Sequence, residues 1–372
     1  MSRIVIVGGY GAFGTRAAER LARESGLSIV IAGRSLAKAR AQAATLVAQG
    51  ARASLEPGLL DATRATAEQI RQFAPAVLIN ASGPFQQQDY SLARTCIAAG
   101  CHYIDLADAR AFVVNVASLD KEARAANVCV ISGASSVPGL SSAAVRQLAD
   151  GLAEVDEVHV GISPGNSFDP GVATVASIIG AAGKPFKVWV DGRWTTAYGW
   201  QRLHRHPFSE IGSRWMGDVD VPDLDLLPLA YPQLRTARFT AGLEVGLFHL
   251  GVWGFSWLAR AGLLRDPGVL AGPLLAVKRR LSMLGTDTGG MFVRVVGRNA
   301  VGARCEGSWQ LVARQGHGPY VPAIASVILA KRLVTGAGAR PGAMPCFDLF
   351  TPAEFEAEVS DLDISCTLDH GA

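Results

Sequence analysis

The chain has 372 residues, two to three times the length of a typical domain, so two domains are expected. Hydrophobic residues make up 49% and charged residues 18%, a globular balance that excludes wholesale disorder, and the 41 glycines follow no collagen-like period. The formal net charge is +3, and the basic residues are scattered rather than gathered into a stripe that could follow a phosphate backbone. Nucleic acid is therefore excluded as an expected partner.

The N-terminal residues MSRIVIVGG lead directly from one arginine into a short apolar run and a pair of glycines. This run is too short and wrongly flanked for a signal peptide, so a cytoplasmic location is expected. The six cysteines form no C-x-x-C pair, and we interpret them as reduced thiols packed as small apolar side chains. No metal site is predicted, because His204 and His206 have no third ligand at a suitable spacing.

From Arg3 to Ile131, short β-branched runs alternate with longer segments of helical period that are rich in Ala and Arg. This alternation predicts parallel strands joined by helices. The predicted fold class is α/β, with a Rossmann doubly wound parallel sheet over residues 1–133. The expected strands are Arg3–Val7, Ser28–Ala32, Ala53–Glu56, Ala76–Asn80, Tyr103–Leu106 and Val128–Ile131, with helices beginning near Ala12, Leu36, Ala65, Tyr90 and Ala111.

A different pattern begins after Ser132, and it predicts a second α+β domain over residues 134–317 with a mostly antiparallel open sheet. Residues 193–232 have no steady period, so long loops over a pocket are expected there. The expected strands are Glu157–Ser163, Phe186–Val190, Met291–Gly297 and Ala303–Arg314, the last two forming an antiparallel pair, and helices are expected at Val321–Thr335 and Pro352–Val359.

The segment Val245–Ala259 (VGLFHLGVWGFSWLA) carries no formal charge when its histidine is neutral. It is too short to cross a membrane, which takes about 20 apolar residues. Two interpretations stay open: a helix of the core or of a dimer interface, and an apolar wall for a hydrophobic substrate or a membrane surface.

Residues 9–14 form a G-x-G-x-x-G motif directly after the first predicted strand and at the start of a predicted helix. Gly9 would permit the tight turn, Gly11 would let the backbone approach a pyrophosphate, and Gly14 would let the helix pack closely on the strand. Free N–H groups and the positive end of the helix dipole would then hold the phosphates. The alternative is a strand-to-helix turn without a ligand. The candidate cofactor residues here are Gly9, Tyr10, Gly11, Ala12, Phe13 and Gly14.

The second predicted strand ends in Gly33-Arg34-Ser35, where an NAD-binding unit would normally place an acidic residue for the ribose 2′-hydroxyl. Arg34 could instead offer a two-pronged contact to a 2′-phosphate, and Ser35 a hydroxyl. This arrangement favours NADP(H) over NAD(H), and the alternative for Arg34 is a solvated surface side chain.

The fourth predicted strand is followed by Asn80, Ala81, Ser82, Gly83 and Pro84, at the carboxyl edge of the sheet where ligands of open α/β sheets bind. The small residues leave room for a ribose, and the Asn80 amide could bond to the ribose or the nicotinamide. A plain strand-ending turn is the alternative. Asp61 could likewise contact the adenine, or be an exposed loop residue.

Hydride transfer also requires a group that handles a proton. Asp105 and Asp108, at the end of the fifth predicted strand, are the candidate catalytic residues, with helix capping as the alternative. His102 precedes this strand and is expected to be a surface or packing residue.

Five segments in this order resemble the saccharopine dehydrogenase and reductase-like family of NADP-linked oxidoreductases: VIVGGYGAFG, IAGRS, VLINASGPF, CIAAGCHYIDLAD and SGASSVPGL. The resemblance implies a Rossmann domain and a second domain, built on an open sheet, that forms the substrate cleft and often the dimer contact. It also implies a C-terminal segment, here residues 318–372, that returns to the first domain. By the same resemblance, Gly9, Gly11, Gly14, Arg34, Ser35 and the loop Asn80–Pro84 fall on cofactor positions.

The expected function is that of an NADP(H)-dependent oxidoreductase acting on a small or apolar carbonyl, imine or enoyl compound. No set of arginines is placed to clamp the carboxylates of saccharopine, and the central region is aromatic, with Trp189, Trp194, Trp200, Trp215, Trp253 and Trp257. The alternative is a non-catalytic NADP-binding protein that associates with a membrane or lipid. A homodimer is expected as the commonest assembly.

Overall fold

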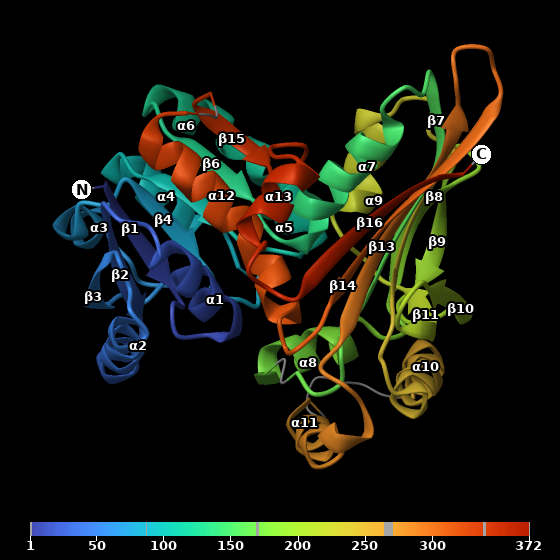
Figure 1. The fold of residues 1–372 in the computed structure, drawn as a ribbon, viewed down its shortest axis with the longest axis horizontal. Coiled ribbons are helices and arrows are strands. Elements are labelled where there is room, and N and C mark those ends of the chain that lie inside the picture. The colour runs from blue at the N-terminus through green and yellow to red at the C-terminus, as the bar shows by residue number, and fades with distance from the viewer. Residues whose placement is uncertain (1, 87, 169–170, 264–270, 338–339, 372) are drawn as a thin grey trace. The chain divides into compact units, whose positions relative to one another are not determined.

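The computed structural model describes residues 2–86, 88–168, 171–263, 271–337 and 340–371. The chain, drawn in Figure 1, divides into two compact units, residues 1–140 with 319–350 and residues 141–318 with 351–372. The predicted return segment 318–372 is therefore shared between the units, because its last strand, β16 (Ile364–Gly371), pairs with β14 (Arg304–Ala313) of the second unit. No helix among the described residues is long and apolar enough to cross a membrane.

The first unit is built on a parallel sheet of seven strands in the order β15-β6-β5-β4-β1-β2-β3. The strand order reverses between β1 and β4, the place where open α/β sheets bind their ligands. This sheet confirms the predicted α/β class and its Rossmann-like parallel sheet. The strands are β1 (Ser2–Val7), β2 (Leu27–Gly33), β3 (Ser54–Leu59), β4 (Val77–Asn80), β5 (His102–Asp105), β6 (Cys129–Ser132) and β15 (Gly342–Pro345).

Helices connect these strands, and the apolar helix predicted at 321–335 is α12 (Val321–Thr335), which is buried over most of its length. The short strand β15 was not predicted, because its four residues, Gly342 to Pro345, carry no alternation and end in a proline. The other helices of the unit are α1 (Ala12–Leu21), α2 (Leu36–Ala48), α3 (Ala67–Phe73), α4 (Ser91–Ala99), α5 (Arg110–Val114) and α6 (Asp120–Ala125).

The second unit contains a nine-stranded sheet in which β12 and β7 are parallel and the other pairs are antiparallel. The predicted second sheet of mostly antiparallel strands is confirmed. Its remaining strands are β7 (Glu154–Ser163), β8 (Pro185–Val190), β9 (Arg193–Tyr198), β10 (His204–Phe208), β11 (Gly212–Asp218), β12 (Thr236–Ala241) and β13 (Gly289–Arg298), and its helices are α7 (Ser141–Ala149), α8 (Gly171–Ala181), α9 (Asp223–Ala230), α10 (Gly246–Arg260), α11 (Ala271–Arg280) and α13 (Pro352–Glu358).

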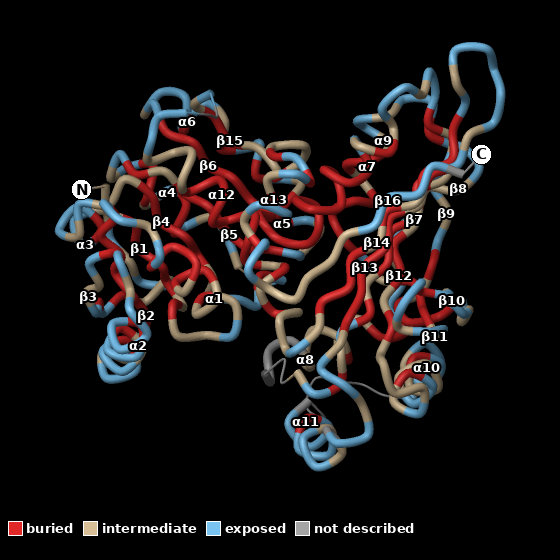
Figure 2. The backbone as a smooth tube through the Cα atoms, viewed as in Figure 1, coloured by how far each residue is buried: buried red, intermediate tan, exposed pale blue. Residues whose placement is uncertain are grey.

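The prediction of long loops over 193–232 is wrong, because β9, β10, β11 and α9 lie in this stretch. The strands were missed because polar and aromatic residues do the packing there. The His206 ring, for example, stacks on Phe292 at 3.5 Å between ring centroids, so an imidazole takes a place that a hydrophobic pattern does not count. Figure 2 shows buried residues running along the strands of each sheet, whereas α2 and α11 are largely exposed.

Candidate functional site

The loop from β1 to α1 depends on glycine at its first two positions. Gly8, and not Gly9 as predicted, takes the left-handed backbone conformation, with φ of +79°. A Cβ on Gly8 would lie 2.9 Å from the Ala81 carbonyl, and one on Gly9 would lie 2.9 Å from the Ile6 carbonyl oxygen. The turn therefore has no space for a side chain at either position.

The other two glycines shape the beginning of α1. A Cβ on Gly14 would lie 2.1 Å from the Gly8 carbonyl oxygen, so the helix could not pack this closely with any other residue. Gly11 is the N-cap, and a Cβ on it would lie 3.1 Å from the Gly8 carbonyl oxygen, with no other described atom beyond its chain neighbours within 4 Å. No described side chain caps this helix end and no acidic residue stands in its first turn, so the N-terminal amides remain suited to an anion such as a pyrophosphate.

Tyr10 connects this loop to the end of β2. Its hydroxyl accepts a hydrogen bond from the Ser35 amide at 2.9 Å, and a Cβ on Gly33 would come within 2.5 Å of the same hydroxyl. The Ser35 hydroxyl in turn accepts from the Lys38 amide at 3.4 Å and is the N-cap of α2. Ser35 therefore has a structural task in addition to its predicted contact with the cofactor.

Arg34 is exposed directly after β2, beside Asp61. The Asp61 carboxylate accepts hydrogen bonds from Thr63, from its amide at 3.0 Å and its hydroxyl at 2.9 Å. These bonds, followed by the charges of Arg34 and Arg64, lower the pKa of Asp61. The structure thus brings Arg34 and Asp61 together at the edge of the sheet where the adenosine half of a dinucleotide would lie.

The loop after β4 is fixed by Asn80, which is buried. Its Nδ2 donates to the Tyr103 hydroxyl at 3.0 Å, and its Oδ1 accepts from the amide and the hydroxyl of Ser82 at 3.1 and 2.5 Å. Gln88, which no sequence pattern marked, donates to the carbonyls of Ser82 and Pro84 at 2.9 Å each. The amide that was predicted to face the ribose is therefore engaged within the protein, while Gly83 and Pro84 are exposed.

Asp105 is completely buried at the end of β5. Its Oδ1 accepts three hydrogen bonds, from the Ala107 amide at 3.0 Å, the Ser132 hydroxyl at 2.9 Å and the Gly133 amide at 2.8 Å. Burial nevertheless raises the pKa of this carboxyl to about 6. These contacts connect the ends of β5 and β6. Asp105 therefore supports the backbone at this edge of the sheet without being exposed itself.

Tyr103 completes this buried polar group. Burial, and then the nearby Asp105 carboxyl, raise the pKa of its phenol well above the ordinary value, so the tyrosine stays protonated. His102 has the packing role expected of it, since its Nδ1 accepts from the Cys129 amide at 2.9 Å.

Asp108, the second predicted catalytic residue, is exposed, and its carboxylate accepts a hydrogen bond from Gln86 Nε2 at 3.3 Å. The surrounding protein atoms keep water from part of the carboxyl, and this desolvation raises its pKa. Hydrogen bonds, including the one from Gln86, offset part of that rise. Of the two aspartates, Asp108 is the one that a ligand could reach.

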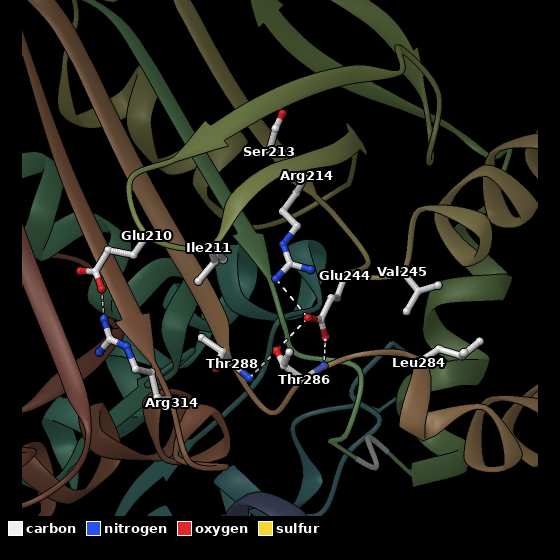
Figure 3. A pocket seen from close by; sticks show the side chains of 10 residues that line it. All are labelled: Glu210, Ile211, Ser213, Arg214, Glu244, Val245, Leu284, Thr286, Thr288 and Arg314. Atoms are coloured by element: carbon white, nitrogen blue, oxygen red, sulfur yellow. Dashed lines mark hydrogen bonds and ion pairs between the residues drawn. The ribbon is translucent and has the colours of Figure 1, made fainter.

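The second unit holds a cavity of about 590 Å³ with an ion pair in its wall (Figure 3). Arg214 Nη2 lies 3.2 Å from Glu244 Oε1, and the two side chains are only 10% and 9% exposed. The Arg214 Nε is buried and has no hydrogen-bond partner among the described residues. The lining residues are Glu210, Ile211, Ser213, Arg214, Glu244, Val245, Leu284, Thr286, Thr288 and Arg314.

Glu244 collects donors from three separate segments of the chain. It accepts from the Asn166 amide at 2.6 Å and from the amide and the hydroxyl of Thr286 at 2.8 and 2.7 Å, in addition to Arg214. Burial acts to raise the pKa of Glu244, but these bonds and the Arg214 charge bring it below its ordinary value. No sequence pattern marks these residues, since they are far apart in the chain. None of the six tryptophans noted in the sequence lines the cavity.

Comparison with known proteins finds a family match for the first part of the chain. Residues 4–131 match the family model of the saccharopine dehydrogenase NADP-binding domain. The search of curated proteins found no match. Among solved structures, apo saccharopine dehydrogenase (L-Glu forming) from Saccharomyces cerevisiae is similar over 100% of both chains, with a TM-score of 0.69 and 13% identity. An amine dehydrogenase from Mycobacterium smegmatis aligns over 94% of this chain and 95% of its own, with a TM-score of 0.47 and 12% identity. The yeast enzyme shares the fold of the whole chain.

Proposed function

We propose that this chain, whose residues 4–131 match the family model of the saccharopine dehydrogenase NADP-binding domain, is an NADP(H)-dependent oxidoreductase. It transfers hydride to or from a small or apolar organic compound that carries a carbonyl, imine or enoyl group. The observation that carries the proposal is the glycine-lined, uncapped N-terminus of α1, together with Arg34, which follows β2 where an acidic residue would stand in an NAD-binding unit.

The described residues fit the cofactor. The missing side chain of Gly11 leaves room for a pyrophosphate against the α1 amides, and Gly14 keeps those amides close to β1. Arg34 supports the preference for a 2′-phosphate, because a charge-assisted hydrogen bond contributes roughly 1.5–3 kcal/mol. When bound, NADP(H) supplies the hydride chemistry.

The chain's own task is then to hold a proton and to orient the substrate. We assign the proton to Asp108, which is exposed and whose carboxyl has a raised pKa, closer to the operating pH of a general acid or base. Asp105 is proposed to act as a positioning residue that fixes Ala107 and the segment after β6.

The cavity of the second unit is the candidate location for the substrate. Arg214 lines this cavity, and its guanidinium is the candidate donor to a substrate oxygen. The side chains of Ile211, Val245 and Leu284 give the same cavity an apolar wall for the rest of a small or apolar molecule.

The test is an NADPH-oxidation assay of the full-length chain with a panel of carbonyl, imine and enoyl compounds. Turnover with at least one class is expected, and Asp108→Asn should lower kcat at least tenfold with unchanged NADPH affinity. Asp150→Asn, which removes an exposed carboxylate in the second unit, is the matched control and should leave kcat unchanged. NADPH binding without turnover on any class would favour the non-catalytic alternative.

A further inference from the structure

Exposed apolar side chains are concentrated in one part of the second unit. Nine of the large apolar residues that are exposed in the described part of the chain lie between positions 247 and 284, and the other six are scattered over both units. We call this set the apolar surface: Leu247, Leu250, Trp257, Leu258, Leu263, Leu274, Val277, Met283 and Leu284. Several are mostly exposed, among them Leu247 at 72% and Met283 at 85% exposure.

Helix α10 carries apolar residues on its half-buried side as well as on its exposed side. Its two buried residues are the polar His249 and Ser256, both 0% exposed. His249 Nδ1 accepts from the Leu243 amide at 3.3 Å, and the Ser256 hydroxyl donates to the Trp253 carbonyl at 2.6 Å. A surface helix in water normally has polar residues on its outer side, so the exposed leucines and Trp257 of α10 suit an apolar environment there.

Helix α11 also exposes apolar side chains, at the same end of the second unit in Figure 1. Leu275 is its buried anchor at 1% exposure, whereas Leu274 and Val277 are 39% and 51% exposed. Lys278 Nζ fastens the helix by donating to the Asn166 carbonyl at 2.8 Å, and Arg280 at its end is exposed. An apolar side and an exposed cationic end thus stand on one short helix.

Basic residues occur in the same part of the chain as the exposed apolar ones. Among the described residues between positions 245 and 285, Arg260, Arg279 and Arg280 are exposed and no acidic residue occurs. A second copy of the chain would bring the same positive charges face to face in a two-fold interface. An anionic lipid surface, in contrast, complements both the charge and the exposed leucine and tryptophan side chains.

We propose that the apolar surface of α10 and α11 docks this protein on an anionic membrane, as a peripheral contact that inserts its leucines and Trp257 at the level of the lipid headgroups. The described helices are too short and too mixed to cross a bilayer, so the protein lies on the membrane. Leu284 belongs to this surface and also lines the cavity described above.

The test is flotation of the full-length chain with vesicles of phosphatidylglycerol and phosphatidylcholine, and with vesicles of phosphatidylcholine alone. The wild type should float with the anionic vesicles, and raising the salt concentration should release it. The double variant Leu247→Glu with Leu258→Glu should lower the bound fraction at least tenfold, and Arg280→Glu about tenfold. Leu229→Glu, at a side chain that is 74% exposed on α9, is the matched control and should bind as the wild type does.

All four sites are exposed, so the variants are expected to fold, and their NADPH affinity, measured on the same samples, should equal that of the wild type. Absence of flotation for the wild type would overturn the proposal without touching the cofactor site. So would a double variant that binds vesicles as well as the wild type does, or one that loses a dimer seen by sedimentation, since a second copy would then be the occupant.

Discussion

Arg34 decides, in this account, which nicotinamide dinucleotide the chain prefers. Replacing it by aspartate removes the donor for a 2′-phosphate and places an acid where NAD-binding units have one. We expect Arg34→Asp to weaken NADPH binding by about 10- to 100-fold, with NADH binding changed much less. Fluorescence titration with both cofactors measures this. Arg40→Asp, the same charge change at an exposed position of α2, is the control, and an unchanged preference in Arg34→Asp would contradict the assignment.

Two glycines of the first loop should respond differently to the same substitution. Gly14→Ala would push a methyl group to within 2.1 Å of the Gly8 carbonyl oxygen, so we expect a loss of about 1–3 kcal/mol in the free energy of unfolding. In Gly11→Ala the added methyl group would lie 3.1 Å from the Gly8 carbonyl oxygen, a milder conflict. This variant should keep most of the free energy of unfolding while it loses dinucleotide affinity. Gly180→Ala, where no atom lies within 4 Å, is the control. If Gly14→Ala and Gly11→Ala changed dinucleotide affinity and Tm equally, the two glycines would not have separate roles in packing and in binding.

The buried Asp105 carboxyl should make the free energy of unfolding depend on pH. Its pKa in the folded state is about 6 against an ordinary 3.8, so between these values the folded chain holds a proton that the unfolded chain has lost. The contribution of this group to stability is therefore present at low pH and is lost as the pH rises through about 6.

Asp105→Asn keeps an oxygen for the same three donors and removes the titration. Relative to wild type, the variant should gain on the order of 2–3 kcal/mol in the free energy of unfolding between pH 4 and pH 7. Urea unfolding across that range measures the difference. A difference that does not vary with pH would show that the carboxyl is already ionised at the lower end.

The residues that sequence reasoning could find are those whose task is local. The glycines of the first loop and Arg34 each act within a few residues of a strand end, so spacing alone indicates them. Asp105 could be named, but its burial could not, because two of its donors come from the segment at the end of β6. The roles of Gln88 and Glu244 could not be predicted from the sequence, because only the folded structure shows which groups they contact.

At the scale of elements, Glu244 holds β11, the segment after β7 and the segment before β13 together. Glu244→Ala should destabilise the second unit by about 3–5 kcal/mol, because it leaves the Arg214 cation buried without its partner. Urea unfolding measures the loss. Glu210→Ala, which removes a half-exposed partner of Arg314, is the control and should cost less than about 1 kcal/mol. Equal losses would contradict the importance given to the buried pair.

Lowering the pH should reduce the stability that Glu244 contributes to the second unit. The pKa of Glu244 in the folded state lies below its ordinary 4.5, so as the pH falls the unfolded chain takes up this proton first. The stability that the group contributes is therefore present above that ordinary value and is lost as the pH falls through the folded-state pKa. The stability gap between the wild type and Glu244→Ala should narrow as the pH is lowered from 6 to 3, and a constant gap would contradict this linkage.

Elements were predictable where the hydrophobic period is regular. The six strands expected in the first unit and the buried helix α12 follow from alternation and helical spacing alone. The strands β9, β10 and β11 were missed because histidine, arginine and tryptophan side chains pack there in place of aliphatic ones. Four-residue β15 becomes a strand only by pairing with β6, a contact between segments more than 200 residues apart.

At the scale of the whole molecule, the chain consists of two units, each completed by a part of the C-terminal region. Residues 319–350 add α12 and β15 to the first unit, and residues 351–372 add α13 and β16 to the second. The family resemblance implied that the chain returns to the first unit after residue 318. It did not imply that residues 351–372 then go back to the second unit. Strand β16 pairs along β14 over eight residues, and only this pairing shows where the last residues belong.

The central claim is that the first unit binds a nicotinamide dinucleotide and prefers the one with a 2′-phosphate. Calorimetric titration of the purified full-length chain with NADPH and with NADH tests it most directly. Saturable binding of both, with NADPH at least tenfold tighter, is the predicted result. Heat traces without saturation for either compound, or tighter binding of NADH, would contradict it.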